Sequence, residues 1–423
     1  MNFSLSNISK KIEISGIVQG VGFRPFVYQL ALHYDLKGSV LNNALGVCIE
    51  IQGEAKNIDN FLKSLQEELP SLARIDTLIS SEIPSKAYED FSIIQSEEGI
   101  YKKAFVSPDI ALCDDCLSEM NSDSDRRYNY ELINCTQCGP RYSITKTLPY
   151  DRKNTSMSFF KMCESCEREY HNPLNRRYHA QPISCFDCGP KIQLYDALGE
   201  VLHVSNDAIL VVAKFLKQGK IIAIKGIGGF HLVCDASNKE AIARLRERKK
   251  RPKKPFAVMF GDFHSAQKNV TCKAQEAELL QSKERPIVLL ERTKENHIAD
   301  NVAPDIHRLG VMLAYTPIQH LLFKYLDAPI VATSANRADE PIYRSFEQIR
   351  DNLSEVVDAI LDVNRDIVNA IDDSVVQVVA GHLQIMRLGR GYAPLSMVLP
   401  FQTPKKILAL GACSARLQDF SQT

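Results

Sequence analysis

Two stretches at the centre of the chain decide how its fold is organised: CDDCLSEMNSDSDRRYNYELINCTQCGP at residues 113–140 and CESCEREYHNPLNRRYHAQPISCFDCGP at residues 163–190. They align without a gap at an offset of 50 residues, and they share two CxxC pairs, an Arg-Arg-Tyr triplet and a closing Gly-Pro. Such self-similarity indicates that a small module has been duplicated. We therefore expect residues 105–190 to contain two modules, spanning 113–138 and 163–188.

The cysteine spacing predicts that each module binds a metal ion. A CxxC pair places two thiolates on one side of a tight turn, and two pairs close a tetrahedron around Zn²⁺ without leaving an open position. The sequence thus predicts two structural zinc ions, whose binding would contribute much of the folding free energy of this segment. We expect pairing within each repeat, with a cross-braced arrangement as the alternative; the repeated spacing argues against disulfides or separate redox pairs. The eight predicted ligands are Cys113, Cys116, Cys135, Cys138, Cys163, Cys166, Cys185 and Cys188.

The composition is that of a globular, multidomain protein. The 423 residues are 45% hydrophobic and 24% charged, a length that predicts roughly two to four domains. Lys+Arg and Asp+Glu both number 51, so net charge gives no argument for a nucleic-acid or membrane partner. The first residues contain no apolar segment typical of a signal peptide, and no apolar run is long enough to span a membrane. We expect a cytoplasmic location, where reducing conditions favour thiolate metal ligands over disulfides.

The segment before the modules, residues 10–96, reads as strand, helix, strand, strand, helix and strand. Apolar residues recur at helical spacing over 23–34 and 55–69, whereas alternation marks the strands between and after them, the last two lying around 75–83 and 91–94. This β-α-β-β-α-β order predicts a ferredoxin-like sandwich.

A glycine-rich turn joins the first strand of this segment to its first helix. Glycines let backbone N–H groups turn inward, the helix N-terminus adds partial positive charge, and the Arg24 guanidinium matches phosphate oxygens. The stretch GIVQGVGFRPF (16–26) resembles the signature of the acylphosphatase family, and GSVLNN (38–43) resembles its second motif. The resemblance implies that Arg24 binds the phosphate of an acyl phosphate while Asn42 orients water for in-line attack, without a covalent enzyme intermediate; a turn role is the alternative for Asn42. The other expected phosphate-loop residues are Gln19, Gly20, Val21, Gly22 and Phe23.

Residues 203–390 alternate helix-like stretches with apolar runs such as IIAIKGIGG and PIVATSAN, which predicts an α/β domain with a largely buried sheet. The basic run 248–255 follows a helix, and Ser334 and Asn336 end an apolar strand, where open α/β sheets bind ligands. Considered alone, the basic run could be a solvated face and the Ser-x-Asn segment a helix cap.

Together these segments resemble the YrdC family, whose Lys-x-Arg and Ser-x-Asn signatures fall on Lys249 with Arg251 and on Ser334 with Asn336. The resemblance implies ATP binding, with Mg²⁺, and synthesis of a carbamoyl-type adenylate. Cations would neutralise charge as a carbamate oxygen attacks the α-phosphorus. Further candidates for contacts to nucleotide phosphates are Lys225, Arg387 and Arg390.

The whole arrangement, over about residues 10–411, resembles the carbamoyltransferase family of nickel–iron hydrogenase maturation. The fold expected is thus multidomain, α+β in front and α/β behind. The resemblance implies that carbamoyl phosphate is hydrolysed in the front domain, that carbamate is adenylated in the α/β domain, and that a last, kinase-like domain passes the carbamoyl group to the C-terminal cysteine of the protein HypE. We read 391–423 as a shortened start of that last domain, and therefore expect hydrolysis, and adenylate at most, without complete transfer.

Two other functions compete with this reading. One is a tRNA-modification enzyme that makes threonylcarbamoyl-adenylate; the acylphosphatase-like motif and the zinc modules argue against it. The other is a zinc-binding scaffold or nucleic-acid binder, which the balanced charge and the intact Arg24 and Asn42 disfavour.

Overall fold

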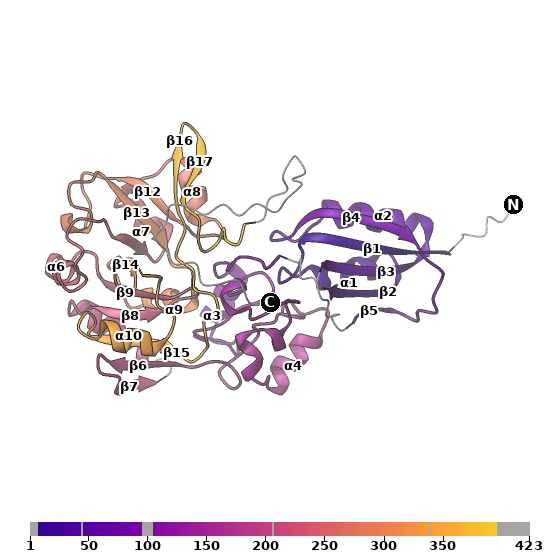
Figure 1. The fold of residues 1–423 in the computed structure, drawn as a ribbon, viewed down its shortest axis with the longest axis horizontal. Helices are drawn as coiled ribbons and strands as arrows, with labels where there is room; N and C mark the ends of the chain where they lie inside the picture. Colours follow the sequence, from indigo (N-terminus) through magenta and orange to yellow (C-terminus); the bar gives the residue numbers. More distant parts are fainter. Residues whose placement is uncertain (1–6, 44, 95–104, 205–206, 339, 396–423) are drawn as a thin grey trace.

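The computed structural model describes residues 7–43, 45–94, 105–204, 207–338 and 340–395. Three parts follow one another along the chain, and the cysteine-rich part lies between the two larger ones (Figure 1). Nearly all of the predicted last segment, 391–423, lies outside the described residues, so its interpretation stays a prediction. Among the described residues, no helix has the length and apolar character needed to cross a bilayer.

The front domain is the predicted ferredoxin-like sandwich. Its elements are β1 (Asn7–Ile17), α1 (Phe23–His33), β2 (Lys37–Asn43), β3 (Gly46–Glu54), α2 (Ala55–Glu67), β4 (Arg74–Glu82) and β5 (Phe91–Ile93). The sheet order is β4-β1-β3-β2-β5, in which the edge strand β5 pairs parallel with β2. Alternating strand residues such as Ile12 and Ile49 meet Val27 of α1 and Phe61 of α2 in one buried core. This packing fixes the β1–α1 turn at one end of the sheet.

The cysteine-rich part has little regular structure. Its elements are α3 (Asp114–Asn121), α4 (Glu164–His171) and the short 3₁₀ helices η1 (Tyr142–Ile144), η2 (Arg152–Asn154) and η3 (Ser156–Phe159). In each repeat the first CxxC opens the helix, since Cys113 and Cys163 occupy the N-cap positions. Leu112, Cys116 and Ile133 of the first module are buried in the same cluster as Ile222 of the large sheet. The first module is therefore packed into the core of the following domain.

The third part is built on one mixed sheet with the order β17-β16-β12-β13-β10-β14-β9-β8-β15-β6-β7, with β11 paired to β12. Its strands are β6 (Ile192–Asp196), β7 (Val201–Val204), β8 (Ile222–Lys225), β9 (Phe230–Asp235), β10 (Ala257–Phe260), β11 (Val270–Thr271), β12 (Ile287–Arg292), β13 (Arg308–Leu313), β14 (Ile330–Ser334), β15 (Ala359–Val363), β16 (Val375–Val379) and β17 (His382–Arg387). Its helices are α5 (Asp207–Lys217), α6 (Lys239–Arg248), α7 (Phe263–Gln267), α8 (Ala274–Gln281), α9 (Pro317–Phe323), α10 (Phe346–Leu353) and the 3₁₀ helix η4 (Asp300–Val302).

Both faces of this sheet are covered, as the apolar strand runs predict. Ile222 and Ile224 of β8 join an apolar cluster with α5 on one face, whereas Ala223 joins the cluster with α6 on the other. The sheet already begins with β6 and the edge strand β7, both of which start before residue 203, where the sequence placed the start of this domain. These short strands follow directly on the second cysteine module and tie it to the sheet.

Candidate functional site

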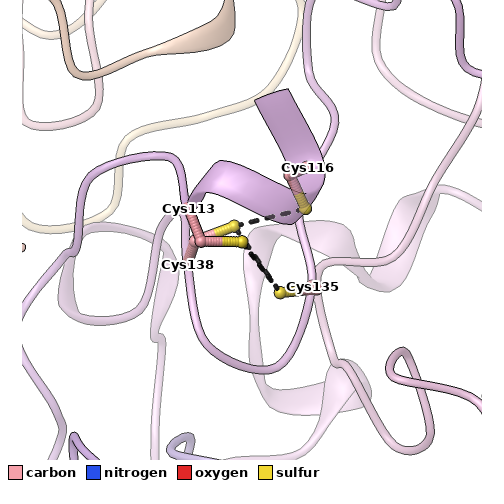
Figure 2. A group of neighbouring side chains, drawn as sticks. All are labelled: Cys113, Cys116, Cys135 and Cys138. Carbon is pink, nitrogen blue, oxygen red and sulfur yellow. Dashed lines mark hydrogen bonds between the residues drawn. The ribbon is translucent and has the colours of Figure 1, made fainter. Parts of the chain in front are cut away.

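The eight predicted cysteines form two clusters, each drawn from one repeat. In the first, the Sγ–Sγ distances are 3.7 Å for Cys113–Cys135, 3.7 Å for Cys135–Cys138 and 3.6 Å for Cys138–Cys116. Figure 2 shows that these four side chains point toward one another. Four sulfurs at 2.3 Å from a tetrahedral zinc ion lie about 3.8 Å apart. The pairing within each repeat is confirmed, the cross-braced alternative is wrong, and the donor sets fit Zn²⁺.

The second cluster has the same geometry. Its Sγ–Sγ distances are 3.7 Å for Cys163–Cys185, 3.9 Å for Cys185–Cys188 and 3.6 Å for Cys188–Cys166. These separations are far longer than a disulfide bond of about 2.05 Å. In each cluster, the four thiol groups are thus arranged around a centre of their own.

The Arg-Arg-Tyr triplet of each module reaches across to the other module. Arg176 donates from Nη2 to Sγ of Cys116 at 3.0 Å and to Glu119 at 2.7 Å, and Arg177 also donates to Glu119. Burial would raise the pKa of Glu119, but the hydrogen bonds from Arg176 and Arg177 outweigh it and lower this pKa to about 2. The acidic residue on α3 is therefore ionised and held between two arginines of the second module.

The reciprocal contacts run from the first module to the second. Arg126 donates to Sγ of Cys166 at 3.1 Å, and Arg127 donates to Glu169 at 2.6 Å and to the Ser184 carbonyl at 2.9 Å. The sequence shows this triplet as part of the repeat. Its role in the structure is to place positive charge beside the thiolates of the neighbouring cluster and to join the two modules.

The glycine-rich turn of the front domain forms a pocket at the start of α1. Gly20 and Gly22 both have φ +74°, in the left-handed region that favours glycine. Arg24 lies in the first turn of α1. With the amide of Asn42 on β2 oriented so that its oxygen faces Arg24, the side-chain oxygen of this fully buried residue accepts from Nε and Nη2 of Arg24, both at 3.2 Å. The structure thus brings together the two residues that the acylphosphatase-like motifs single out.

The cysteine-rich part covers this pocket. Asp151 pairs with Nη2 of Arg24 at 3.0 Å, and Arg141 donates from Nε to the Gly20 carbonyl at 2.5 Å. Tyr150 and His179 also line the pocket, whose volume is about 340 Å³ including the part that is open to solvent. Burial, with the charge of Arg24, lowers the pKa of His179 to about 3, so this imidazole is neutral at pH 7.

The other phosphate-loop residues divide between lining the pocket and holding the domains together. Phe23 lines the pocket, whereas Val21 is buried in the front core. Gln19 donates to the carbonyls of Asn43 and Gly46, both at 2.8 Å, and accepts from the Tyr150 N–H at 3.0 Å. Its amide is therefore a docking contact between the loop and the cysteine-rich part.

The Lys-x-Arg and Ser-x-Asn segments also meet in space. Nζ of Lys249, at the C-cap of α6, donates to the Ser334 carbonyl at 2.7 Å and to Oδ1 of Asn336 at 3.0 Å, and Ser334 donates to the same Oδ1 at 3.1 Å. Arg251 donates to Thr333 at 3.1 Å. Burial and the neighbouring Arg251 lower the pKa of Lys249 to about 8. The solvated-face reading of the basic run fails for these two residues, which lie against the end of β14.

The three remaining cations do not all join this group. Burial, then the charges of Arg246 and Arg387, lowers the pKa of Arg251 to about 10, so Arg387 lies near the site. Lys225 instead pairs with Asp362 at 3.0 Å and donates to the Val363 carbonyl at 2.7 Å.

Arg390 is committed to the protein core. It is 1% exposed, pairs with Asp373 at 2.6 Å and donates to the carbonyls of Glu284 and Arg285 at 3.0 and 2.8 Å. All three guanidinium nitrogens are thus engaged within the chain, because Asp373 supplies a buried counter-charge that the sequence pattern did not reveal.

Comparisons with known proteins identify the same three parts. The acylphosphatase model matches residues 10–93, the HypF finger model matches 112–145 and 162–195, and the telomere recombination (Sua5/YciO/YrdC) model matches 214–389. Carbamoyltransferase HypF of Synechocystis is 49% identical over 400 residues, covering 95% of this chain and 52% of the relative. The chain is thus similar to the HypF carbamoyltransferases over 95% of its length. It spans about half the length of the curated relatives it matches.

Other HypF proteins are similar to this chain over comparable lengths. Carbamoyltransferase HypF2 of Cupriavidus necator is 45% identical over 421 residues, covering 95% of this chain and 52% of the relative. A full-length HypF crystal structure in the phosphate- and nucleotide-bound form superposes with a TM-score of 0.89 at 49% identity, covering 93% of this chain and 51% of that one. The HypF structure from T. kodakarensis gives 0.86 at 41% identity, with coverages of 93% and 51%.

Sequence reasoning missed several HypF-like site residues because their positions depend on folding between domains. Tyr150 and Asp151 lie in the segment between the two finger matches, and His179 lies in the second finger, so all three reach the front pocket only through the packing of the cysteine-rich part against it. His231 pairs with Asp373 at 2.8 Å and lies opposite Ser334 on the β9–β14 ladder.

Proposed function

We propose that this chain performs the early steps of a HypF-type carbamoyltransferase in hydrogenase maturation. Carbamoyl phosphate is hydrolysed in the pocket of Arg24 and Asn42, and the resulting carbamate is adenylated with ATP beside Lys249 and Ser334. The observation that carries the proposal is the juxtaposition of Arg24 and the fully buried Asn42 in one pocket. The homology of the chain to HypF carbamoyltransferases supports the choice of carbamoyl phosphate.

In the first step the pocket binds the phosphoryl group. The turn between Gly20 and Gly22 presents backbone N–H groups, and Arg24 offers charged donors to the phosphate oxygens. Asn42 holds a water molecule in line with the bond to the carbamoyl oxygen. Water attacks phosphorus, the phosphorus–oxygen bond to the carbamoyl group breaks, and inorganic phosphate and carbamate are released. The finger residues above the pocket exclude bulk water and leave room for a small acyl group.

In the second step a carbamate oxygen attacks the α-phosphorus of ATP, and pyrophosphate leaves. Lys249 and Arg251 provide the positive charge that this transfer requires, and the hydroxyl and amide of Ser334 and Asn336 orient the nucleotide. Mg²⁺ bound with the nucleotide would supply further charge neutralisation. Zinc held by the two cysteine clusters would fix the fingers in place over the front pocket.

The carbamoyl adenylate is then the donor for the C-terminal cysteine of HypE, the partner expected for the HypF family. That transfer belongs to the whole HypF-type enzyme, of which this chain spans about half.

The test is to incubate the purified chain with carbamoyl phosphate and ATP and to follow phosphate and pyrophosphate separately. Arg24→Ala should abolish phosphate release, whereas Ser334→Ala should spare it and reduce pyrophosphate release. Threonine-dependent pyrophosphate release that ignores carbamoyl phosphate would instead favour a tRNA-modification enzyme. Loss of phosphate release in Ser334→Ala, or its retention in Arg24→Ala, would contradict the assignment of the two sites.

A further inference from the structure

Arg141 joins the phosphate loop of the front domain to the first cysteine module. The residue follows the second CxxC of that module and is 1% exposed. Its Nε donates to the Gly20 carbonyl at 2.5 Å. Its two terminal nitrogens donate to carbonyls of the CxxC turn, at 3.0 Å for Cys135, 2.8 Å for Thr136, 2.9 Å for Cys138 and 2.8 Å for Pro140. One guanidinium thus holds a glycine of the front domain against a metal-binding turn.

These five contacts use every donor that the Arg141 side chain has. A guanidinium carries five N–H groups and no acceptor. Although Arg141 lines the front pocket, it therefore has no donor left for a substrate bound there. Any effect of this residue on the reaction must act through the loop that it holds.

The second module shows that a cluster of this kind forms without such an arginine. At the repeat offset of 50 residues, Arg141 corresponds to Lys191. In the described part of the chain, Lys191 makes hydrogen bonds only through its backbone, to Asn364. The second cluster nevertheless has Sγ–Sγ distances of 3.7, 3.9 and 3.6 Å, as in the first. The carbonyl contacts of Arg141 thus serve the loop rather than the metal site.

Arg141 sets the direction of the Gly20–Val21 peptide. This peptide is trans, and in a trans peptide the C=O and N–H groups point in opposite directions. Because Arg141 holds the Gly20 carbonyl, the Val21 N–H points away from the arginine. Within the described residues, the N–H groups of Val21, Gly22 and Phe23 donate to no acceptor, although Val21 is fully buried. Buried N–H groups are nearly always paired, so these three indicate an anion at the start of α1.

The neighbouring residue of the loop is held from the same side. Gln19 accepts from the Tyr150 N–H at 3.0 Å and forms an isolated β-bridge with Val106. Val106 and Tyr150 both belong to the part of the chain that follows the front domain. The conformation of the phosphate loop is therefore fixed from outside the front domain at two consecutive residues.

We propose that Arg141 is a positioning residue for the phosphoryl group. By holding the Gly20 carbonyl, it keeps the loop N–H groups turned toward the phosphate oxygens, and it makes phosphate affinity depend on the first zinc module. The inference rests on the proposed function for its link to carbamoyl phosphate. Binding of inorganic phosphate tests it without turnover.

Two isotope labels make the Gly20–Val21 peptide visible by NMR. With ¹³C in glycine carbonyls and ¹⁵N in valine amides, only Gly-Val peptides give a correlation signal, and these lie at 20–21, 46–47 and 310–311. Val21→Ile identifies the first signal by removing it, and the 310–311 signal of the large sheet is the internal reference. In the wild-type chain, inorganic phosphate should shift the Val21 amide. In Arg141→Met, the Gly20 carbonyl carbon should move upfield before phosphate is added, because it no longer accepts from a charged donor.

The same titration gives the phosphate affinity. It should fall by roughly tenfold or more in Arg141→Met, since the lost hydrogen bond comes from a charged donor. Arg246→Met is the matched control, because Arg246 of the third domain also makes five contacts to carbonyl oxygens. Both variants should have a lower Tm, but Arg246→Met should keep the wild-type 20–21 signal and phosphate affinity. Equal losses of phosphate affinity in the two variants would overturn the proposal.

Zinc content shows whether the variant keeps its fold. Arg141→Met should retain both ions, because the second cluster forms without an equivalent arginine. If it does not, Arg141→Lys replaces it, since lysine occupies this position in the second module. A single ammonium lacks the fork that spans the turn and the loop, so phosphate binding should again weaken.

Three results separate the possible outcomes. Wild-type phosphate affinity in a variant that retains zinc would overturn the proposal. Zinc loss from both Arg141 variants would overturn the claim that this arginine serves the loop. A wild-type chain that binds phosphate at the Val21 amide without hydrolysing carbamoyl phosphate would refute the proposed function, while the positioning role of Arg141 would stand.

Discussion

Replacing Glu119 by glutamine should loosen both zinc clusters, although Glu119 belongs to neither set of ligands. The carboxylate lies on α3 of the first finger and accepts from Arg176 and Arg177 of the second finger. Those arginines also donate to Cys116, so the network ties the second finger to the sulfurs of the first cluster. The amide of glutamine keeps the shape of the side chain and removes its charge.

The size of the effect follows from burial. Side-chain exposures are 25% for Glu119, 29% for Arg176 and 4% for Arg177, so one arginine would be left almost fully buried without its carboxylate. Breaking a buried ion pair costs about 3–5 kcal/mol, and the partial exposure of Glu119 favours the lower end, about 3 kcal/mol. That free energy corresponds to roughly a hundredfold weaker retention of zinc.

Competition with a colorimetric zinc chelator measures this retention. The Glu119→Gln variant should release zinc to a chelator whose zinc affinity is roughly a hundredfold lower than the affinity needed for wild type. Both ions should leave in one transition, because the arginine contacts between the two fingers are reciprocal. Glu167→Gln, an exposed residue of α4, changes the net charge equally and should behave as wild type. Wild-type zinc retention in Glu119→Gln, or loss of a single ion, would refute the reasoning.

Two other perturbations test the reaction sites. In Gly20→Ala, the new Cβ would lie 3.1 Å from the ring of Tyr150 at a residue with φ +74°, so phosphate release and Tm should both fall. Gly381→Ala is the control, because Gly381 has φ +77° and nothing within 4 Å of a new Cβ, so this change should cost only the backbone strain of about 1–2 kcal/mol. Equal effects of the two substitutions on phosphate release would contradict a pocket that is covered by the fingers. Because the pKa of Lys249 is about 8 and phosphates bind the ammonium form, ATP affinity measured by calorimetry should fall as pH rises above 8, approaching tenfold per pH unit. Lys249→Arg should flatten this pH dependence. A flat profile for the wild-type chain would contradict a role for Lys249 in binding the ATP phosphates.

The sequence predicts which residues form a site within one module, but not which residues meet between modules. The cysteine pairing and the meeting of Arg24 with Asn42 were predictable because spacing and element order bring these residues together within one small module or one sheet. The Arg-Arg-Tyr repeat was equally visible, but a repeat does not say which cluster its arginines reach. The contact between Arg24 and Asp151 joins residues of different modules, and no local spacing encodes it.

Charged residues near the chain's end show the same limit. Arg387 and Arg390 look alike in a basic, glycine-containing segment, and both were expected to contact nucleotide phosphates. Asp373 neutralises Arg390 in the interior, whereas the charge of Arg387 acts on Arg251. Which cation is structural depends on where the buried carboxylate lies, and that is a property of the tertiary fold.

The most direct measurement is phosphate release from carbamoyl phosphate in ¹⁸O-labelled water, with zinc bound and with Arg24→Ala prepared in parallel. Attack of water on phosphorus in the Arg24 pocket puts one labelled oxygen into each phosphate released by the wild-type chain, while Arg24→Ala shows only the uncatalysed background. Spontaneous elimination breaks the carbon–oxygen bond and leaves the phosphate unlabelled. Unlabelled phosphate from the wild-type chain, or labelled phosphate released equally well by Arg24→Ala, would contradict the account.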